Sequence, residues 1–286
     1  MMIRAVAGLL LWVATGIATA AAVDAVPGLV LDGKWQQGAV LIGQAPVGAR
    51  VWFDGRELRV TDAGRFVFGL HRDASGPAEL KLQLPGRAEP YVIRHAVETR
   101  EYKIQRIDGL PQKMVTPPAE VLERIRADQA LVRKARDHDS ALEGFAEPFE
   151  WPCTGRISGV FGSQRILNGE PRQPHYGVDV AVPVGTEVRA PAGGVVTLAH
   201  PDMYYTGATL MIDHGHGLSS AFLHLSKLLV EEGQVVERGQ PIALSGMSGR
   251  ATGPHLDWRV NWFDARVDAQ LLVPPMPAQA SPSTTP

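Results

Sequence analysis

The sequence predicts a mainly β protein in which two β-rich parts are joined by a helical connector. Glycine and proline are abundant, with 30 and 22 residues, and they separate short apolar runs that are rich in β-branched residues. Frequent turn residues between short apolar segments are typical of all-β folds and not of helical bundles. A chain of 286 residues is long enough for two modest domains, each with a core. The net charge is -2 with mixed signs, so we expect no nucleic-acid partner.

Residues 1–22 have the features of a signal peptide. Arg4 supplies a positive charge, residues 5–18 form an apolar run, and residues 18–20 (Ala-Thr-Ala) fit a cleavage site for small residues. An uncleaved membrane anchor is the alternative, although the run is near the lower length limit for spanning a bilayer. We expect cleavage, no stable membrane span afterwards, and an exported protein in the periplasm, with the extracellular face as the alternative.

Residues 23–106 are expected to form an accessory β-sandwich module. Asp54 and Gly55 provide a hairpin turn between two apolar runs. Strands at this spacing are typical of an immunoglobulin-like module. His71 and His95 are isolated here, and we interpret them as surface or strand histidines. The expected strands cover residues 38–43, 50–53, 58–60 and 66–68.

Residues 107–150 are expected to form a linker with an amphipathic helix. Pro117 and Pro118 mark its start, and Gly144 and Pro148 end the pattern. The helix either packs on one of the domains or covers a functional site, and the sequence leaves both roles open. The apolar residues at near-helical spacing are Val121, Leu122, Ile125, Leu131 and Val132.

Residues 151–273 contain an internal sequence repeat of two similar segments, called the echo below. Residues 184–191 resemble residues 232–239, and each segment is a turn, a short strand and another turn, followed by an apolar strand. Duplicated units of this kind suit an antiparallel β-sandwich.

Cys153 is the single cysteine, so the chain forms no internal disulfide, and we interpret it as a packed core thiol and not as a nucleophile. Residues 274–286 are expected to be a disordered tail.

The second part also concentrates residue types that bind metals. His175 and Asp179 are four apart in a strand-like segment, where alternate side chains point the same way. His224 follows another apolar run. His255 and Asp257 are two apart and share one face of a third strand. This residue set can hold one divalent metal and keep spare imidazoles beside it for acid–base chemistry.

The same segments resemble the LytM/lysostaphin-type zinc metallopeptidases, and the resemblance covers residues 151–273. It implies a duplicated-hybrid-motif β-sandwich with a central groove. It also implies hydrolysis of peptide bonds in the stem peptides or cross-bridges of bacterial peptidoglycan by a metal-activated water. The N-terminal part resembles an accessory β-module of this family. The segments are residues 161–163, 175–179, 190–196, 213–218, 224–226 and 252–257, in the family's order.

The resemblance implies a role for individual residues. His175 and Asp179 match two ligands of a single Zn²⁺ ion. His224 matches the imidazole that acts as general base or orients the water, and His255 matches a second histidine near the reacting carbonyl. Together with the metal, His255 would stabilise the oxyanion.

Asp257 departs from the family, which has histidine as the third zinc ligand at this position. A carboxylate is an acceptable ligand, but it adds a second negative charge to the site. We therefore expect a working but retuned site, with a higher pH optimum or another preferred divalent metal. In the alternative, Asp257 forms an ion pair with Arg259 on the same strand face, and two protein ligands remain.

Three further residues, two histidines and a tyrosine, are of types that can bind a metal or a substrate. The resemblance places His214 and His216 in a structural turn. Tyr204 lies in an expected loop at the rim of the groove. One interpretation is a functional role, in which it binds substrate or assists the oxyanion; the other is that it is only an exposed residue of the groove wall. Both interpretations stay open.

Two functions compete on this sequence. The first is an exported zinc endopeptidase that acts on peptidoglycan. The second is an inactive relative that binds the cell wall or activates another wall hydrolase. Four of the five functional positions match the family, which favours the enzyme. A biotinyl- or lipoyl-type carrier is excluded because the candidate turns, residues 203–205 and 247–249, carry no lysine. The sequence identifies no protein partner.

Overall fold

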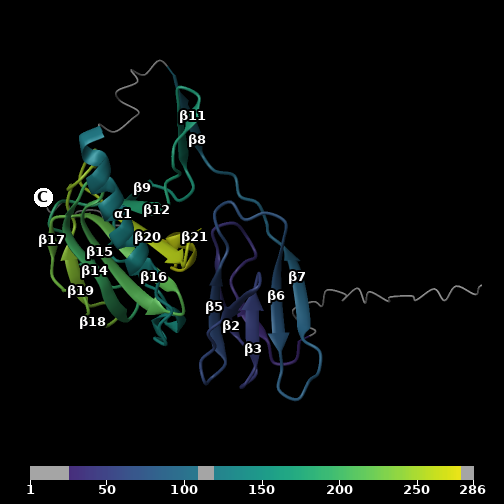
Figure 1. The fold of residues 1–286 in the computed structure, drawn as a ribbon. Coiled ribbons are helices and arrows are strands. Elements are labelled where there is room, and N and C mark those ends of the chain that lie inside the picture. Colours follow the sequence, from purple (N-terminus) through teal and green to yellow (C-terminus); the bar gives the residue numbers. More distant parts are fainter. Residues whose placement is uncertain (1–25, 109–118, 278–286) are drawn as a thin grey trace, which may run out of the picture.

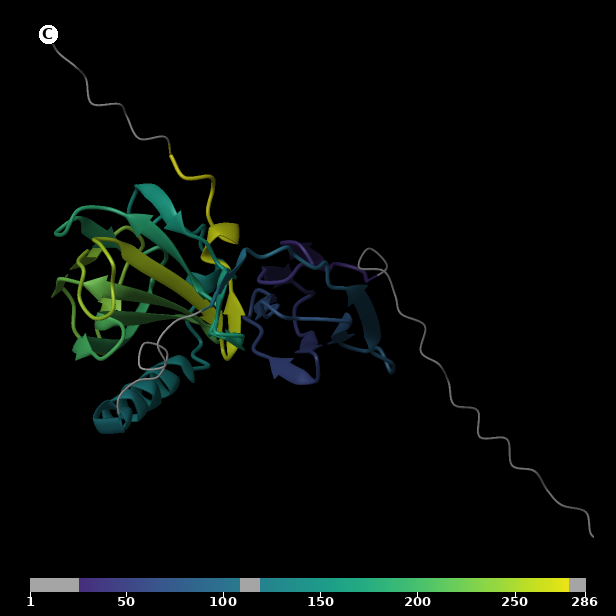
Figure 2. The same ribbon diagram turned by 90° about the horizontal axis from the view of Figure 1, so that it is seen from above.

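The computed structural model describes residues 26–108 and 119–277, which form two β-rich parts side by side and one long helix (Figure 1). The predicted signal peptide and residues 278–286 lie outside the described residues. A view from above separates the N-terminal part from the larger C-terminal part, with the helix on the latter (Figure 2). None of the helices in the described ranges has the length and apolar character that crossing a membrane requires. The predicted mainly β fold is confirmed.

The N-terminal part consists of two small antiparallel sheets with strand orders β1-β2-β5 and β4-β3-β6-β7. The rings of Phe53 and Phe68 stack between them with centroids 4.3 Å apart. Asp54 and Gly55 both have positive φ, which confirms the predicted hairpin turn. The immunoglobulin-like character stays a prediction. The strands are β1 (Val30–Asp32), β2 (Val40–Gln44), β3 (Arg50–Phe53), β4 (Arg56–Leu58), β5 (Arg65–Gly69), β6 (Pro77–Gln83) and β7 (Tyr91–Ala96).

The next strand already belongs to the C-terminal part by its pairing. β8 (Ile104–Ile107) runs parallel to β10 (Gln164–Leu167), which also pairs with β11 (Glu170–Pro171). The predicted border at residue 106 therefore falls inside a strand. The division into domains stays a prediction.

The connector helix is α1 (Leu122–Arg136), preceded by the 3-10 turn η3 (Ala119–Val121). It ends earlier than the sequence pattern indicated. The backbone N–H of Asp137 bonds back to the carbonyl of Arg133, and Arg59 then holds the chain by donating to the carboxylate and the carbonyl of Asp139, at 3.0 and 2.9 Å. The segment after the helix thus contacts the N-terminal part. The 3-10 turn η4 (Gly144–Ala146) follows.

The C-terminal part is a sandwich of a large and a small antiparallel sheet. The large sheet has the order β18-β14-β15-β16-β20-β12-β9 with β21 added to β20, and the small sheet is β13-β19-β17. The elements are β9 (Arg156–Gly159), β12 (Gly177–Ala181), β13 (Glu187–Arg189), β14 (Gly194–Met203), β15 (Gly207–Gly215), β16 (Leu218–Leu225), β17 (Lys227–Leu228), β18 (Val235–Val236), β19 (Pro241–Leu244), β20 (Leu256–Trp262), β21 (Ala265–Val267) and the 3-10 turn η5 (Ala269–Leu271).

The two copies of the sequence echo pair with each other. The first copy supplies β13 and β14, and the second supplies β18 and β19. Glu187 of β13 lies opposite Leu244 of β19, while Gly194 of β14 lies opposite Val236 of β18. Each copy therefore contributes one strand to each sheet, which confirms the predicted duplicated sandwich.

The large sheet has two different faces. Its inner face fills the core of the sandwich with residues such as Phe222 and Trp258, both 0% exposed. On the outer face, Leu223 lies opposite Asp257 and Ala221 lies opposite Arg259. Leu223 and Ala221 belong to an apolar cluster that includes Ala135 of α1. The connector therefore packs on the face of the sheet that also carries the predicted metal ligands.

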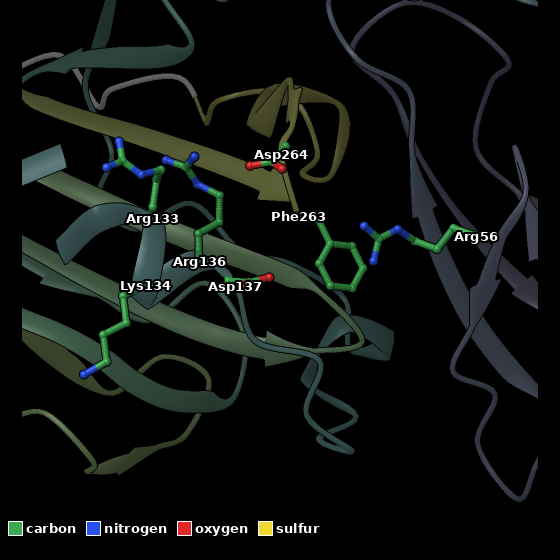
Figure 3. A pocket seen from close by; sticks show the side chains of 7 residues that line it. All are labelled: Arg56, Arg133, Lys134, Arg136, Asp137, Phe263 and Asp264. Atoms are coloured by element: carbon green, nitrogen blue, oxygen red, sulfur yellow. The ribbon is translucent and has the colours of Figure 1, made fainter. Parts of the chain in front are cut away.

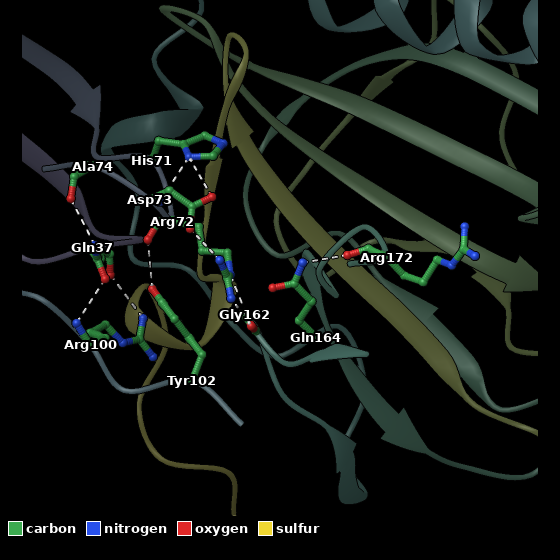
Figure 4. Close-up of polar contacts among 10 residues, drawn as sticks. All are labelled: Gln37, His71, Arg72, Asp73, Ala74, Arg100, Tyr102, Gly162, Gln164 and Arg172. Atoms are coloured by element: carbon green, nitrogen blue, oxygen red, sulfur yellow. Dashed lines mark hydrogen bonds and ion pairs between the residues drawn. The ribbon is translucent and has the colours of Figure 1, made fainter. Parts of the chain in front are cut away.

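Buried polar contacts hold the two β-rich parts together (Figure 4). The guanidinium of Arg72 donates from Nε and Nη2 to the carbonyl of Gly162, at 3.1 and 2.6 Å. Arg100 forms a 2.8 Å ion pair with Asp268, whose side chain is 2% exposed. Because such pairs lose much of their stability if they are separated, the N-terminal part has a defined position on the C-terminal part.

Cys153 is buried, as the sequence predicts. Burial raises the pKa of its thiol to about 12. The thiol is therefore protonated at neutral pH and is a poor nucleophile, in agreement with a packed core residue.

Candidate metal centre

The three predicted metal ligands converge. His175, Asp179 and Asp257 each offer one ligand atom, and these atoms lie within 4.8 Å of one another. Asp179 of β12 and Asp257 of β20 are direct neighbours across two paired strands. His175 precedes β12 in a loop that two backbone hydrogen bonds fix, from its N–H to Ser163 and from Gly162 to its carbonyl, both 2.8 Å.

The facing atoms of two of these residues have no hydrogen-bond partner. Nε2 of His175 and Oδ1 of Asp179 are 3.2 Å apart, within ion-pair reach, and burial alone would lower the pKa of this imidazole, but the contact with Asp179 and the charge of Asp257 raise it. Both atoms are buried, and neither has a well-aligned hydrogen bond among the residues that the structure describes. Buried polar atoms are costly without a partner, so two of them aimed at a common point fit a bound cation.

Two glycines make room for the carboxylates. A Cβ on Gly159 would overlap Oδ2 of Asp179, and a Cβ on Gly177 would overlap Oδ1 of Asp257. The second Cβ would also meet Cγ of Arg259 at 2.8 Å. The strands therefore lack side chains at the places where the carboxylates lie flat on the sheet.

Asp257 is paired with Arg259. Nε of Arg259 donates to both carboxylate oxygens at 3.1 Å, and Nη2 donates to Oδ2 at 2.6 Å. The Asp257 side chain is 3% exposed. Burial alone would raise the pKa of this carboxyl, but the charge and the hydrogen bonds of Arg259 outweigh it and hold the pKa below its ordinary value. The ion pair that the sequence offered as an alternative is thus present together with the convergence on one centre.

The two predicted catalytic histidines lie beside this centre. Nδ1 of His224 bonds to the carbonyl of Ser248 and Nδ1 of His255 to that of Gly253, both at 2.8 Å. A carbonyl only accepts, so Nδ1 carries the proton in both rings and Nε2 is left as the basic atom. Nε2 of His255 is 3.8 Å from Oδ1 of Asp179, and the two imidazole rings are 4.8 Å apart.

The environment keeps His224 suited to accept a proton. Burial lowers the pKa of its imidazole, although the Ser248 carbonyl and Asp257 act in the opposite direction. His224 has φ 62, a backbone conformation that is rare for residues with a side chain. Such backbone strain beside a cluster of possible metal ligands is typical of functional residues.

The donor set fits a divalent metal. One imidazole nitrogen and two carboxylate oxygens match the ligand types of Zn²⁺ and of harder divalent ions. The two aspartates contribute two negative charges, and Arg259 compensates one of them. The ligands and this arginine therefore have the same net charge as a site of two histidines and one aspartate.

Gly177 provides a test of this geometry. Gly177→Ala should weaken metal binding by about tenfold, because the new methyl group displaces Asp257 and Arg259, and partners of this kind influence metal affinity by about 10- to 100-fold. Competition with a chromogenic chelator measures the affinity. Gly253→Ala is the matched control, since a Cβ there meets open space. Equal effects of the two substitutions would contradict the assignment.

The remaining predicted site residues lie elsewhere. The backbone N–H of Tyr204, in the turn between β14 and β15, donates to Asp128 of α1 at 2.7 Å. Its role in substrate binding stays a prediction. His214 is 0% exposed and bonds to the Gly193 carbonyl and the Ser220 hydroxyl, both at 2.8 Å. His216 packs on Phe145 with ring centroids 4.3 Å apart. These contacts support structural roles for both histidines.

His214 should make the fold sensitive to acid. Complete burial lowers the pKa of its imidazole below the ordinary 6.5, so the native state excludes a proton that the unfolded chain binds. The free energy of unfolding should therefore decrease as the pH falls below 6.5, by at most about 1.4 kcal/mol per pH unit from this group. Urea unfolding between pH 5 and 7 measures the slope. His214→Gln should reduce it, and an unchanged slope would refute the role of this histidine.

The N-terminal part reaches the same region, which the sequence did not indicate. The ring of His71 meets that of Tyr176, the residue after His175, with centroids 6.3 Å apart. Arg266 of β21 lies over the other side of the region, 5.2 Å from the same tyrosine ring. No local pattern in the sequence signals either contact, because both depend on how the two parts pack.

Comparison with known proteins agrees with this geometry. The model of Peptidase family M23 matches residues 173–269, which include all five predicted metal-binding and catalytic residues. A crystal structure of a putative peptidase M23 from Pseudomonas aeruginosa is 30% identical, with a TM-score of 0.65, and the match covers 84% of this chain and 95% of that one. The chain belongs to peptidase family M23. The predicted resemblance is thereby confirmed.

Several curated proteins match part of this chain. Peptidoglycan DD-endopeptidase ShyA of Vibrio cholerae is 45% identical over 108 residues, which are 37% of this chain and 24% of the relative. DD-carboxypeptidase/endopeptidase Mpg of Neisseria meningitidis is 37% identical over 130 residues, 46% of this chain and 29% of the relative. The match thus spans about a quarter of the length of each of these relatives.

Proposed function

We propose that this M23 protein is an exported metal-dependent endopeptidase that hydrolyses peptide bonds in bacterial peptidoglycan. The convergence of His175, Asp179 and Asp257 within 4.8 Å carries the proposal. The names of the curated relatives, which include peptidoglycan DD-endopeptidases and a DD-carboxypeptidase/endopeptidase, support the substrate class. A periplasmic location follows from this substrate and from the signal-like residues 1–22.

His175, Asp179 and Asp257 would hold one zinc ion, or another divalent metal. When bound, such an ion supplies Lewis acidity at the scissile carbonyl and lowers the pKa of water. Nε2 of His224 accepts the proton of the attacking water, because Nδ1 is held by the Ser248 carbonyl. His255, with its ring fixed in the same way, lies beside the developing oxyanion and donates to it when protonated.

Arg259 changes the expectation for Asp257. The sequence alone predicted an extra negative charge that weakens the metal as a Lewis acid. The three hydrogen bonds from Arg259 make the pair neutral, so we propose that the pair takes the place of a neutral imidazole ligand. The site then needs no large shift of its pH optimum.

Metal analysis of the purified chain, followed by zymography on peptidoglycan gels with and without chelator, tests the proposal. We expect about one bound divalent ion per chain, clearing of the gel, and loss of clearing with chelator that added zinc restores. Absence of both metal and clearing would overturn the proposal and support the inactive relative. Clearing that resists the chelator would contradict metal dependence.

A further inference from the structure

Arg136, the last residue of α1, is a buried cation that forms no ion pair with any residue that the structure describes. The residue is 8% exposed, and its Nε is buried with no hydrogen-bond partner among the described residues. Arginine is rarely buried to this extent unless it is paired. The carboxylate of Asp264 attracts its charge, but the two groups form no ion pair. The fold therefore keeps a desolvated guanidinium available for a further partner.

This guanidinium lines a pocket of about 240 Å³ where three segments meet. Arg133 and Lys134 of α1 lie beside Arg136, and Phe263 and Asp264 come from the turn between β20 and β21 (Figure 3). Arg56 of the N-terminal part closes the pocket, with its guanidinium 4.1 Å from the ring of Phe263. The walls carry four cationic side chains against the two carboxylates of Asp137 and Asp264.

The positive charge extends from the pocket toward the metal centre. Arg266, next along the same face, has its pKa lowered to about 10 by burial and by the charges of Arg136 and Arg259. Arg266 bonds to the neutral side chain of Asn261 at 2.6 Å. Of these three arginines, Arg259 has a close anionic partner, so an excess of positive charge remains at the pocket end. This potential favours an anionic group there.

The pocket and the metal centre lie along one strand. β20 carries Asp257 near its start, and Phe263 follows its end. Six residues of strand span about 20 Å. Between the two sites Asn261 is 1% exposed and bonds to Arg266, so a peptide that extends from the metal centre would cross Arg266 and reach the pocket several residues away from the scissile bond.

We propose that this pocket binds a carboxylate of the substrate peptide, remote from the bond that is cut. The inference rests on the proposed peptidoglycan substrate, whose stem peptides carry free carboxylates. Arginine forks match a carboxylate with two parallel hydrogen bonds, and Arg136, which lines the pocket and has no ion-pair partner among the described residues, offers its terminal nitrogens for them. Arg56 gives the N-terminal part a role in the same site.

The test compares two forms of one probe. The full chain, stripped of metal by chelator so that it does not hydrolyse, is titrated into a fluorescent cross-linked stem-peptide dimer and into the same dimer with amidated carboxylates. We expect the free form to bind about 10- to 100-fold more tightly, as for hydrogen bonds to charged groups. Arg136→Met should abolish this preference, and Lys134→Met, at an exposed position that tolerates change, should reduce it. Arg126→Met on the same helix, outside the pocket, should keep it.

Equal affinities for both forms in the unmodified chain would overturn the proposal, as would a preference that survives both pocket substitutions. Inorganic phosphate serves as a competitor. Phosphate that displaces the free form supports the pocket, whereas phosphate that binds the chain without displacing the probe indicates a small-anion site and overturns the proposal. The proposed function fails separately: loss of zymogram activity with a retained carboxylate preference leaves the pocket in place.

Discussion

His175→Ala should abolish both metal binding and the hydrolysis of peptidoglycan. The substitution removes one of three ligand atoms that lie within 4.8 Å of one another and leaves the two carboxylates. Loss of a partner that merely orients a ligand costs about 10- to 100-fold in metal affinity, so loss of the ligand itself should exceed 100-fold. Metal content after dialysis and clearing of peptidoglycan gels measure the two effects.

The control is His95→Ala. This histidine lies in β7 of the N-terminal part and stacks on Trp35 with ring centroids 4.9 Å apart. It should leave metal content and activity unchanged. The backbone hydrogen bonds of residue 175 do not involve the imidazole, so thermal unfolding of His175→Ala without metal should stay close to that of the unmodified chain. Full metal content in this variant would disprove the assignment of the ligand.

Asp257→His should weaken zinc binding although it installs the family's usual ligand. The substitution removes the partner of Arg259 and leaves an unpaired guanidinium at the metal centre. At a separation of about 5 Å, repulsion of a divalent ion by this charge reaches several kcal/mol with an effective dielectric constant near 20, and solvent at the half-buried arginine reduces it. We expect affinity to fall by about tenfold or more, as measured by chelator competition.

Removing the arginine as well should reverse the loss. Arg259→Gln in the Asp257→His background gives a site of two imidazoles and one carboxylate without the cation, so zinc affinity should rise by about tenfold relative to the single variant. Arg266→Gln in the same background is the control, because Arg266 bonds to Asn261 and not to Asp257. If Asp257→His binds zinc as tightly as the unmodified chain, the two residues do not act as a unit.

The shared strand faces of the predicted metal ligands follow local rules, whereas the role of each residue came from the resemblance to the metallopeptidase family. Alternation along a strand places His255 and Asp257 on one face and extends that face to Arg259. The echo between residues 184–191 and 232–239 likewise predicted paired strands, since turn and strand patterns are local. These features need only the period of a strand and the order of the segments.

Other features depend on long-range packing and left no local signal. α1 ends at Arg136, and three residues later Asp139 bonds to Arg59 of the N-terminal part. The burial of Arg136 results from the position of α1 on the sheet, and in sequence it is one charge among many on a polar helix. The contact of His71 with Tyr176 depends on the packing of both β-rich parts. Each of these features depends on residues that are distant in sequence, so the local periodicity of the sequence could not predict it.

The exchange of strands between the two copies of the echo has a consequence for biosynthesis. Glu187 finds its neighbour in Leu244, and Gly194 finds its neighbour in Val236, so neither sheet is complete until the second copy has left the ribosome. Contacts of such high sequence separation raise the contact order and slow the search for the native topology. The native topology of both sheets therefore depends on strands from the second copy, which is made last.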